Sequence, residues 1–169
     1  MASASQQGDA LRSLGPATYF AGVLMVGLTL ADVVATIWPL QFGEIQWRYG
    51  AWGLLSGFLL TPVFGLFMLA AAGVILAHVR VLKALWWVNL ALALVLVAGC
   101  VMFALDVLQL RGAVPPEAKL RFDVGAVKAV VKHLLVAVGL FWLGWACRRG
   151  ASDAAVRRRS GSSGVLVGS

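Results

Sequence analysis

Apolar residues fill four long stretches of the chain, and short segments richer in polar and charged residues separate them. The stretches cover residues 17–38, 52–77, 84–105 and 124–147. An α-helix rises about 1.5 Å per residue, so about 20 residues cross the roughly 30 Å hydrocarbon layer of a bilayer. Each stretch is long enough to do so. The pattern therefore predicts an all-α polytopic membrane protein, a four-transmembrane-helix bundle with short loops.

The same pattern divides the chain into three segments. We expect a cytoplasmic N-terminal segment at 1–15, the transmembrane bundle at 16–147, and a basic C-terminal tail at 148–169. The tail is rich in Arg, Ser and Gly and has no apolar period, so it is predicted to be disordered. Its arginines are expected to contact lipid head groups, and they are Arg148, Arg149, Arg157, Arg158 and Arg159.

Composition supports a membrane as the solvent. Hydrophobic residues make up 61% of the chain and charged residues only 12%, whereas a soluble domain carries about 25% charged residues. The net charge of +7 comes from basic residues that lie mainly at the ends of the apolar stretches and in the tail. We therefore expect the lipid bilayer, and no nucleic acid, as the partner of these charges.

The distribution of Lys and Arg predicts the orientation. Segments on the side of both termini hold eight basic residues and the opposite side holds six, two of which (Lys128 and Lys132) lie inside the fourth stretch. Because cytoplasmic loops of membrane proteins carry an excess of Lys and Arg, both termini are expected in the cytoplasm. The predicted location is a bacterial inner membrane.

Seven tryptophans cluster near the predicted membrane boundaries. Indole rings favour the head-group region because one edge forms hydrogen bonds while the face stays apolar. We expect all seven to be interfacial anchors, and they are Trp38, Trp47, Trp52, Trp86, Trp87, Trp142 and Trp145. A ligand stacked between Trp47 and Trp52 is the alternative.

Small and polar residues predict which helix faces point inward. Membrane helices associate through close packing and hydrogen bonds, so stripes of Gly, Thr and Ala mark candidate interfaces. Such stripes include Gly22 and Thr29 in the first stretch, and Gly53, Gly57 and Gly65 in the second. Pro62 is expected to kink the second stretch, because proline removes a backbone hydrogen bond and crowds the preceding turn.

Four ionisable residues within or at the end of the apolar stretches form a candidate intramembrane ionic cluster: Asp32, Asp106, Lys132 and His133. Asp32 and Lys132 lie at matching depth, about 22–24 Å from the cytoplasmic ends of their helices by helical rise. An unpaired charge in hydrocarbon is costly, so the two are expected to pair. Two alternatives remain: a proton or ion relay through Asp32, Asp106 and His133, and charges that face a partner subunit.

Neither catalysis nor a cofactor is indicated by the remaining candidates. Cys100 and Cys147 lie at different predicted depths, too far apart for a disulfide, and are expected to be inert packing residues. His78 and His133 lie in opposite halves of the membrane, so they cannot clamp one haem iron within the chain. We therefore predict no catalytic residues, no metal, no cofactor and no enzymatic activity.

About 25 residues resemble a known family. Trp47-Arg48 and Pro62-x-x-Gly65-Leu66-x-x-Leu69, preceded by Asp32 and Pro39, are similar to a segment of HpsJ-like small bacterial membrane proteins. The charged residues expected before the proline are replaced by Gly57-Phe58-Leu59-Leu60. The resemblance implies an accessory role in exopolysaccharide secretion or exosortase systems, without enzymatic activity.

The function that these patterns favour is that of a non-enzymatic accessory or assembly subunit of a larger membrane complex. Its expected partners are other membrane protein subunits or further copies of itself. The alternative is a small proton-coupled carrier or channel that uses Asp32, Asp106 and His133. The four stretches look unbroken, which favours the accessory role, because carriers commonly build a midplane site from broken helices.

Overall fold

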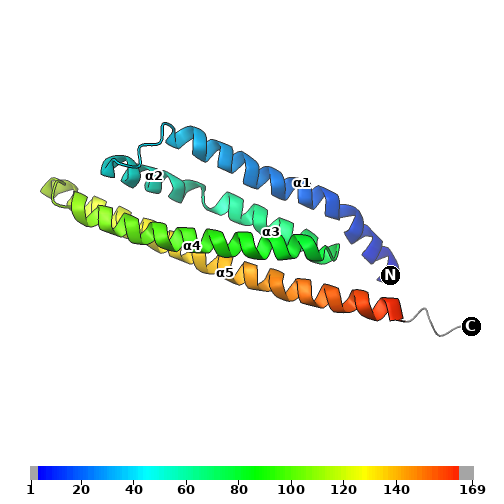
Figure 1. Cartoon of the computed structure of the whole chain (residues 1–169). Helices are drawn as coiled ribbons and strands as arrows, with labels where there is room; N and C mark the ends of the chain where they lie inside the picture. The colour runs from blue at the N-terminus through cyan, green and yellow to red at the C-terminus, as the bar shows by residue number, and fades with distance from the viewer. Residues whose placement is uncertain (1–3, 164–169) are drawn as a thin grey trace, which may run out of the picture.

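Helices account for almost all of the described chain (Figure 1). The computed structural model describes the fold of residues 4–163 and the side chains of residues 13–156. The helices are α1 (Ala4–Ile37), α2 (Ile45–Phe58), α3 (Leu60–Ile75), α4 (Val79–Leu110) and α5 (Lys119–Ser163), with a short 3-10 helix η1 (Pro116–Ala118) before α5. Three of them are long and apolar enough to span a membrane, and α2 and α3 provide a fourth if the bent pair is one span. The all-helical, membrane-spanning prediction agrees with this.

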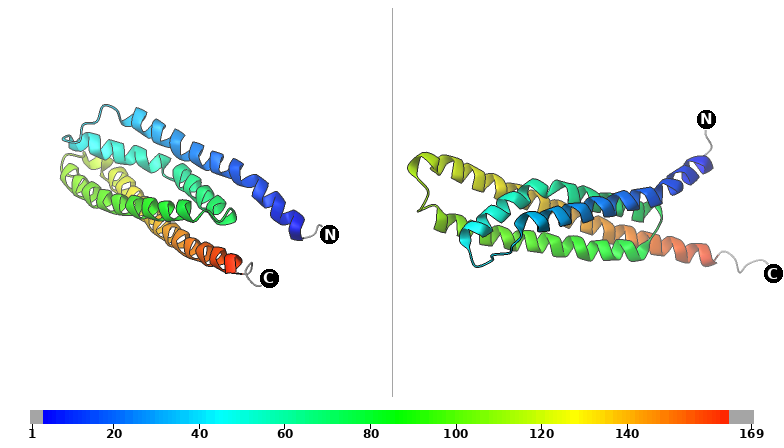
Figure 2. Two further views of the ribbon diagram at one scale, coloured as in Figure 1. Left: turned by 45° about the vertical axis from the view of Figure 1, so that its right-hand side comes forward. Right: turned by 90° about the horizontal axis from the view of Figure 1, so that it is seen from above.

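The helices lie in three layers (Figures 1 and 2). The α1 layer covers α2 and α3, which in turn cover the antiparallel pair α4 and α5. The α1 backbone approaches α2 and α3 closely but neither α4 nor α5. The first described turns of α1 and the last of α5 lie at the same end of the molecule. This agrees with an even number of spans.

The core follows a seam of small and apolar residues between α4 and α5. Buried residues recur on α4 at steps of three and four: Leu82, Leu85, Asn89, Ala93, Leu96, Cys100, Phe103 and Asp106. The facing residues of α5 are mostly small, and they include Ala126, Ala129, Ala137, Gly144, Cys147, Ala151 and Ala154. Short side chains let two helix backbones come close, which is the main source of helix association in lipid. Steps of three and four over the full length of α4 are those of an antiparallel coiled pair.

A second close contact joins α1 to α3. A Cβ atom placed on Gly22 would lie 2.9 Å from the Gly65 carbonyl oxygen, and one on Gly65 would lie 2.8 Å from the Gly22 carbonyl oxygen. Both glycines therefore serve as close-packing residues, as the stripes predicted. Gly53 and Gly57 are instead exposed, and a Cβ atom on either would have no neighbouring atom within 4 Å. The predicted stripe fails there because the helix breaks between the two halves.

That break lies at Leu59, where the helix axis turns by 47° between α2 and α3. Pro62 is the third residue of α3, so its missing N–H falls where the carbonyl oxygen of Phe58 would otherwise accept. The predicted kink is confirmed. The expectation that no span is broken is wrong, since the bend is sharp enough to divide the second stretch into two helices.

A three-residue turn reverses the chain between α3 and α4. The N–H of His78 donates to the Gly73 carbonyl oxygen at 2.9 Å and that of Ala77 to the Val74 oxygen at 3.2 Å, the two bonds of a Schellman motif. Ala77 adopts the left-handed φ of 51° that this motif requires. These bonds satisfy carbonyls that the end of α3 would otherwise leave unpaired.

Three predicted boundaries differ from those of the helices. The second stretch becomes helical at Ile45 rather than 52, so most of the expected outer loop belongs to α2. The tail predicted to be disordered from Arg148 continues α5 as far as Ser163, while residues 164–169 lie outside the described chain. The cause is the seam itself, because Ala151 and Ala154 extend its spacing beyond Cys147 and are buried. The N-terminal segment likewise joins α1 from Ala4.

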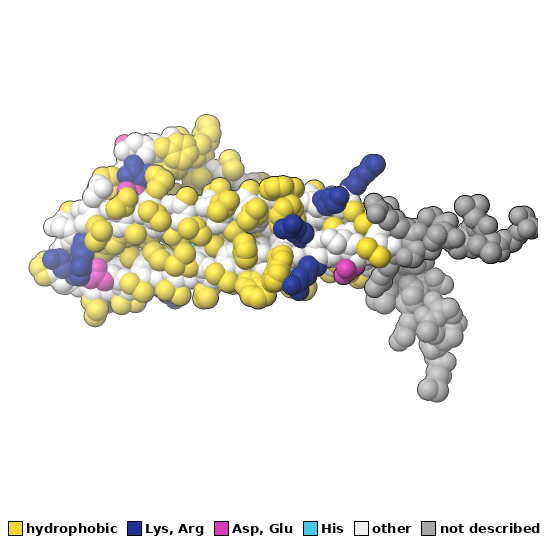
Figure 3. Space-filling view, turned by 60° about the horizontal axis from the view of Figure 1, so that its bottom comes forward, with side chains coloured by type: hydrophobic (Ala, Val, Ile, Leu, Met, Phe, Trp, Pro, Cys, Tyr) yellow, Lys and Arg dark blue, Asp and Glu magenta, His cyan; other side chains and the backbone are white. Residues whose placement is uncertain are grey.

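Charged side chains gather toward the two ends of the face that carries α4 and α5 (Figure 3). Between them the visible surface is mostly hydrophobic. The large exposed hydrophobic residues of α4 and α5 include Leu94, Val95, Val138 and Phe141. An apolar belt of this extent on a protein surface is typical of contact with lipid.

Candidate functional site

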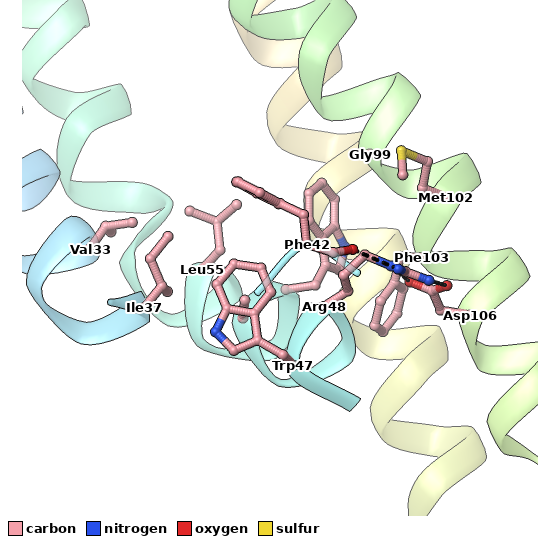
Figure 4. Close-up of a pocket in the computed structure, with 12 residues that line it drawn as sticks. Val33, Ile37, Phe42, Trp47, Arg48, Leu55, Gly99, Met102, Phe103 and Asp106 are labelled. Carbon is pink, nitrogen blue, oxygen red and sulfur yellow. Dashed lines mark hydrogen bonds and ion pairs between the residues drawn. The ribbon is translucent and has the colours of Figure 1, made fainter. Parts of the chain in front are cut away.

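Arg48 on α2 and Asp106 on α4 form a bidentate ion pair (Figure 4). Arg48 Nε donates to Asp106 Oδ2 at 2.9 Å, and Nη2 donates to Oδ1 at 2.6 Å. Arg48 Nη1 also donates to the Phe42 carbonyl oxygen at 2.7 Å. Asp106 is only 5% exposed, so this paired geometry compensates a buried carboxylate. The guanidinium thereby ties the loop after α1 to both α2 and α4.

The sequence predicted Asp106 as an ionic residue but missed its partner. Arg48 comes four residues before the predicted second span and Asp106 directly follows the third. Both therefore belong to the same end of the bundle. Their shared depth could have indicated the pair. The sequence did not reveal it because Arg48 was expected in a loop, whereas it lies on α2.

A cavity of about 250 Å³ lies beside the ion pair. Val33 and Ile37 of α1 stand on one side of it and Met102 and Phe103 of α4 on the other, with Leu55 of α2 between (Figure 4). Apart from Arg48 and Asp106 the lining is apolar. The cavity exists because α1 does not close against α4 at this end. Its chemistry suits an apolar group with one hydrogen-bonding end.

His133 lies at the centre of the molecule, fully buried against Trp52. The two rings stack with centroids 4.3 Å apart and planes 16° apart. His133 Nδ1 is 2.7 Å from the Ala129 carbonyl oxygen, which can only accept, so Nδ1 carries the proton and donates. His133 Nε2 and Trp52 Nε1 are buried and have no hydrogen-bond partner among the described residues. Both are orphaned polar atoms in an apolar core.

This stack is one end of an aromatic column that links α2 to α4 and α5. Successive ring centroids are 5.0, 5.3, 6.1 and 4.3 Å apart, in the order Phe122, Tyr49, Phe103, Trp52 and His133. Gly99 on α4 makes room for the column, because a Cβ there would collide with the Trp52 ring. The column adds ring contacts to the ion pair between Arg48 and Asp106 in holding α2 against α4.

The predicted pair of Asp32 and Lys132 does not form. Lys132 Nζ donates to the Ser56 carbonyl oxygen of α2, near the helix break. Asp32 is exposed on α1, and the ion pairs of the described side chains are Arg48 with Asp106 and Arg111 with Asp123. The physical reason is the layering, since α2 and α3 separate α1 from α5. The four predicted residues therefore do not make one cluster.

The tryptophans differ in how exposed their rings are. Trp38, Trp87 and Trp142 are more than 60% exposed, as anchors in lipid or at its boundary would be. Trp52 differs, because its ring is packed among Phe103, Gly99 and His133; its prediction as an interfacial anchor is wrong. Position at the edge of an apolar stretch could not distinguish an outward ring from an inward one.

Two further tryptophans contact arginines near the start of α4 and the end of α5. The Arg148 guanidinium carbon lies 4.9 Å from the centre of the Trp86 ring, and that of Arg149 lies 3.9 Å from the Trp145 ring. Trp47 packs edge-on against Phe42 beside the cavity. Side chains of the other predicted head-group contacts, Arg157 to Arg159, lie outside the described residues.

The two cysteines and His78 take no part in this site. Cys100 and Cys147 are buried and unbonded, as expected for packing residues. Within the described part of the chain, no three His, Cys, Asp or Glu residues are grouped so that they could hold a metal ion. His78 shares a 3.0 Å hydrogen bond with the Tyr19 hydroxyl at the start of α4.

Comparison with known proteins adds no relative. Scans of family models, of curated proteins and of solved structures each found no match. The resemblance to HpsJ-like proteins around Trp47 and Pro62 thus stays a hypothesis.

Proposed function

We propose that this protein is a non-enzymatic accessory or assembly subunit of a larger membrane complex, a four-span bundle that binds a membrane-spanning helix of another chain through α1. The observation that supports this is Asp32. It is exposed on an apolar helix, and no described side chain pairs with it. A charged residue costs about 2.5–3.5 kcal/mol at the centre of a membrane helix on insertion scales, and Asp32, five residues before the end of α1, bears part of that cost.

A basic residue on a partner helix would offset that cost. α1 leaves its outer side free for such a helix, because it packs only on α2 and α3. Among its described polar side chains, Thr18, Thr29 and Thr36 need no partner, because each donates to the carbonyl oxygen four residues earlier. The partner chemistry is therefore a transmembrane helix with a Lys or Arg at the depth of Asp32.

Inside the bundle, the ionisable groups take part in contacts between or within helices. Arg48 binds Asp106, Lys132 binds the Ser56 carbonyl oxygen, and His133 binds that of Ala129. These bonds hold the fold together and account for the groups without a substrate. A structural role for the core and a binding role for α1 together fit an assembly subunit.

The experiment is purification in mild detergent followed by mass spectrometry of the intact complex. The wild-type protein should carry a second membrane chain at fixed stoichiometry, Asp32→Leu should lose it, and Asp32→Glu should keep it. Asp153→Asn removes an exposed carboxylate at the other end of the chain and is the control. A photo-crosslinker at Leu28 on α1 should reach a partner segment that contains Lys or Arg, whereas one at Leu94 on α4 should not. A wild-type protein that is only ever a monomer or homo-oligomer contradicts the proposal.

We also propose the orientation with both termini in the cytoplasm of a bacterial inner membrane. In a variant without Cys100 and Cys147, Glu44→Cys and Glu117→Cys should react with a membrane-impermeant thiol reagent in intact cells. Asp153→Cys should react only after lysis. Labelling at 153 but not at 44 in intact cells reverses the orientation.

The carrier remains the second candidate, because one observation favours it. Span two is broken at Leu59, and a cavity with a buried ion pair lies beside its outer half. Discontinuous helices next to a cavity are how many carriers build their sites. Reconstituted protein that drives pH-dependent uptake, lost in Asp32→Asn, would overturn the accessory proposal.

A further inference from the structure

Two adjoining cavities open between the start of α4 and the end of α5, at the end opposite the Arg48–Asp106 pair. One has a volume of about 280 Å³ and the other of about 410 Å³, and Trp86 and Arg148 line both. The shared residues make them two parts of one groove. Because the groove lies where the apolar belt ends, it crosses the expected boundary between hydrocarbon and head groups.

The two parts differ in chemistry. The deeper part is lined by Leu90, Phe141 and Gly144 in addition to the shared residues, and it suits a hydrocarbon chain. The outer part adds Lys83 and Ser152, so it presents two cationic side chains and a hydroxyl. Figure 3 shows Lys and Arg side chains gathered at this end of the apolar surface. The polarity therefore changes along the groove as it changes along a phospholipid.

No ion pair among the described side chains neutralises the positive charge of the groove. Neither described ion pair involves Lys83, Arg148 or Arg149. Arg148 is held over the face of Trp86 and Arg149 over that of Trp145, at 4.9 and 3.9 Å. A cation–π contact orients a guanidinium while leaving its N–H donors available for an anion.

We propose that this groove is a specific site for an anionic glycerophospholipid. Lys83 and Arg148 bind the phosphate, and one acyl chain lies along Leu90 and Phe141. A free phosphate ion would make no contact with the apolar part of the groove. A zwitterionic lipid would place its own cationic group next to the arginines. The site does not depend on a protein partner, so it can exist whether or not α1 binds another chain.

The test is native mass spectrometry of the full-length protein in mild detergent, with phosphatidylglycerol or phosphatidylcholine of equal chain length added. Wild-type protein should retain phosphatidylglycerol preferentially. Each basic residue near a membrane surface contributes about 1 kcal/mol to binding of anionic lipid, so Lys83→Gln and Arg148→Gln should each weaken binding about fivefold. Phe141→Ala should weaken binding of both lipids by removing part of the chain site.

Arg80→Gln is the matched control. Arg80 is exposed at the same end of α4 and carries the same charge, but it lines neither part of the groove. Arg148→Lys preserves the charge and tests the guanidinium contact if Arg148→Gln does not fold. Equal retention of the two lipids overturns the proposal, as does a loss in Arg80→Gln equal to that in Arg148→Gln. Displacement of phosphatidylglycerol by millimolar inorganic phosphate alone would show an ion site rather than a lipid site.

Discussion

α1 and the α4–α5 pair are similar in hydropathy but differ in how they are packed. The most apolar stretch of α1 has a mean hydropathy of 2.1, between the 2.6 of α4 and the 1.8 of α5. Only 11% of that stretch is buried inside the protein, compared with 28% in α4 and 33% in α5. Hydropathy therefore indicates which helices can lie in a membrane, but not which of them face protein.

Small residues account for the difference. The seam of α5 places Ala, Gly or Cys at most of its buried positions from Ala126 to Ala154, so α4 can approach it closely. α1 approaches the α3 backbone closely at Gly22, and the polar Asp32 on it stays exposed. The α4–α5 pair is therefore the more buried part of the protein, and α1 is the helix that we propose for binding a partner. Four predictions test this division.

The largest effect is expected at the buried ion pair. Arg48→Ala leaves the buried Asp106 carboxylate without its two hydrogen bonds from the guanidinium and should lower the free energy of unfolding by about 3 kcal/mol or more. Thermal or denaturant unfolding in detergent measures this. Asp123→Ala, which breaks the exposed pair with Arg111, is the control and should cost about 0–1 kcal/mol. Equal losses in the two variants would mean that α4 is not anchored by Asp106.

A smaller loss is expected at the contact between α1 and α3. Gly22→Leu would push a side chain against the Gly65 backbone and Leu69, and overpacking of this kind costs about 1–3 kcal/mol. Gly27→Leu is the matched control, since a Cβ on Gly27 has no atom within 4 Å. A cysteine cross-link between α1 and α3 should become inefficient in the first variant alone. If both variants behave alike, α1 does not pack on α3 through Gly22.

The buried histidine should tolerate replacement by an apolar aromatic ring. His133→Phe keeps the stack on Trp52 and removes the orphaned Nε2 together with the bond to Ala129, so stability should change by no more than about 1 kcal/mol. Partner binding should be unaffected. A reconstituted carrier that loses pH-dependent uptake in this variant would show that His133 acts as a relay rather than as a packing residue.

The smallest effect is expected for the two charges that were predicted to pair. Because α2 and α3 separate Asp32 from Lys132, Asp32→Ala and Lys132→Ala should be additive within about 0.5 kcal/mol in a double-mutant cycle. Asp32→Ala alone should barely change the stability of the isolated chain. Coupling well above this limit would mean that α1 contacts α5 and that the layered arrangement is wrong.

The membrane environment and the helical content follow from the sequence alone. Four apolar stretches of more than 20 residues leave few alternatives, because a backbone in hydrocarbon must satisfy its own hydrogen bonds. The kink near Pro62 could also be predicted from the local sequence, since it follows from one missing N–H. The burial of Cys100 and Cys147 also followed from their apolar neighbours in sequence.

Which residues meet depends instead on the tertiary structure. Depth along a helix predicted a pair between Asp32 and Lys132, but the layers placed Asp106 with Arg48 and left Asp32 exposed. The basic tail became helix because Ala151 and Ala154 continue the seam with α4. In lipid, helices associate by shape and by hydrogen bonds rather than by hydrophobicity. Hydropathy can therefore place each helix in the membrane, whereas the neighbours of that helix depend on packing between distant parts of the chain.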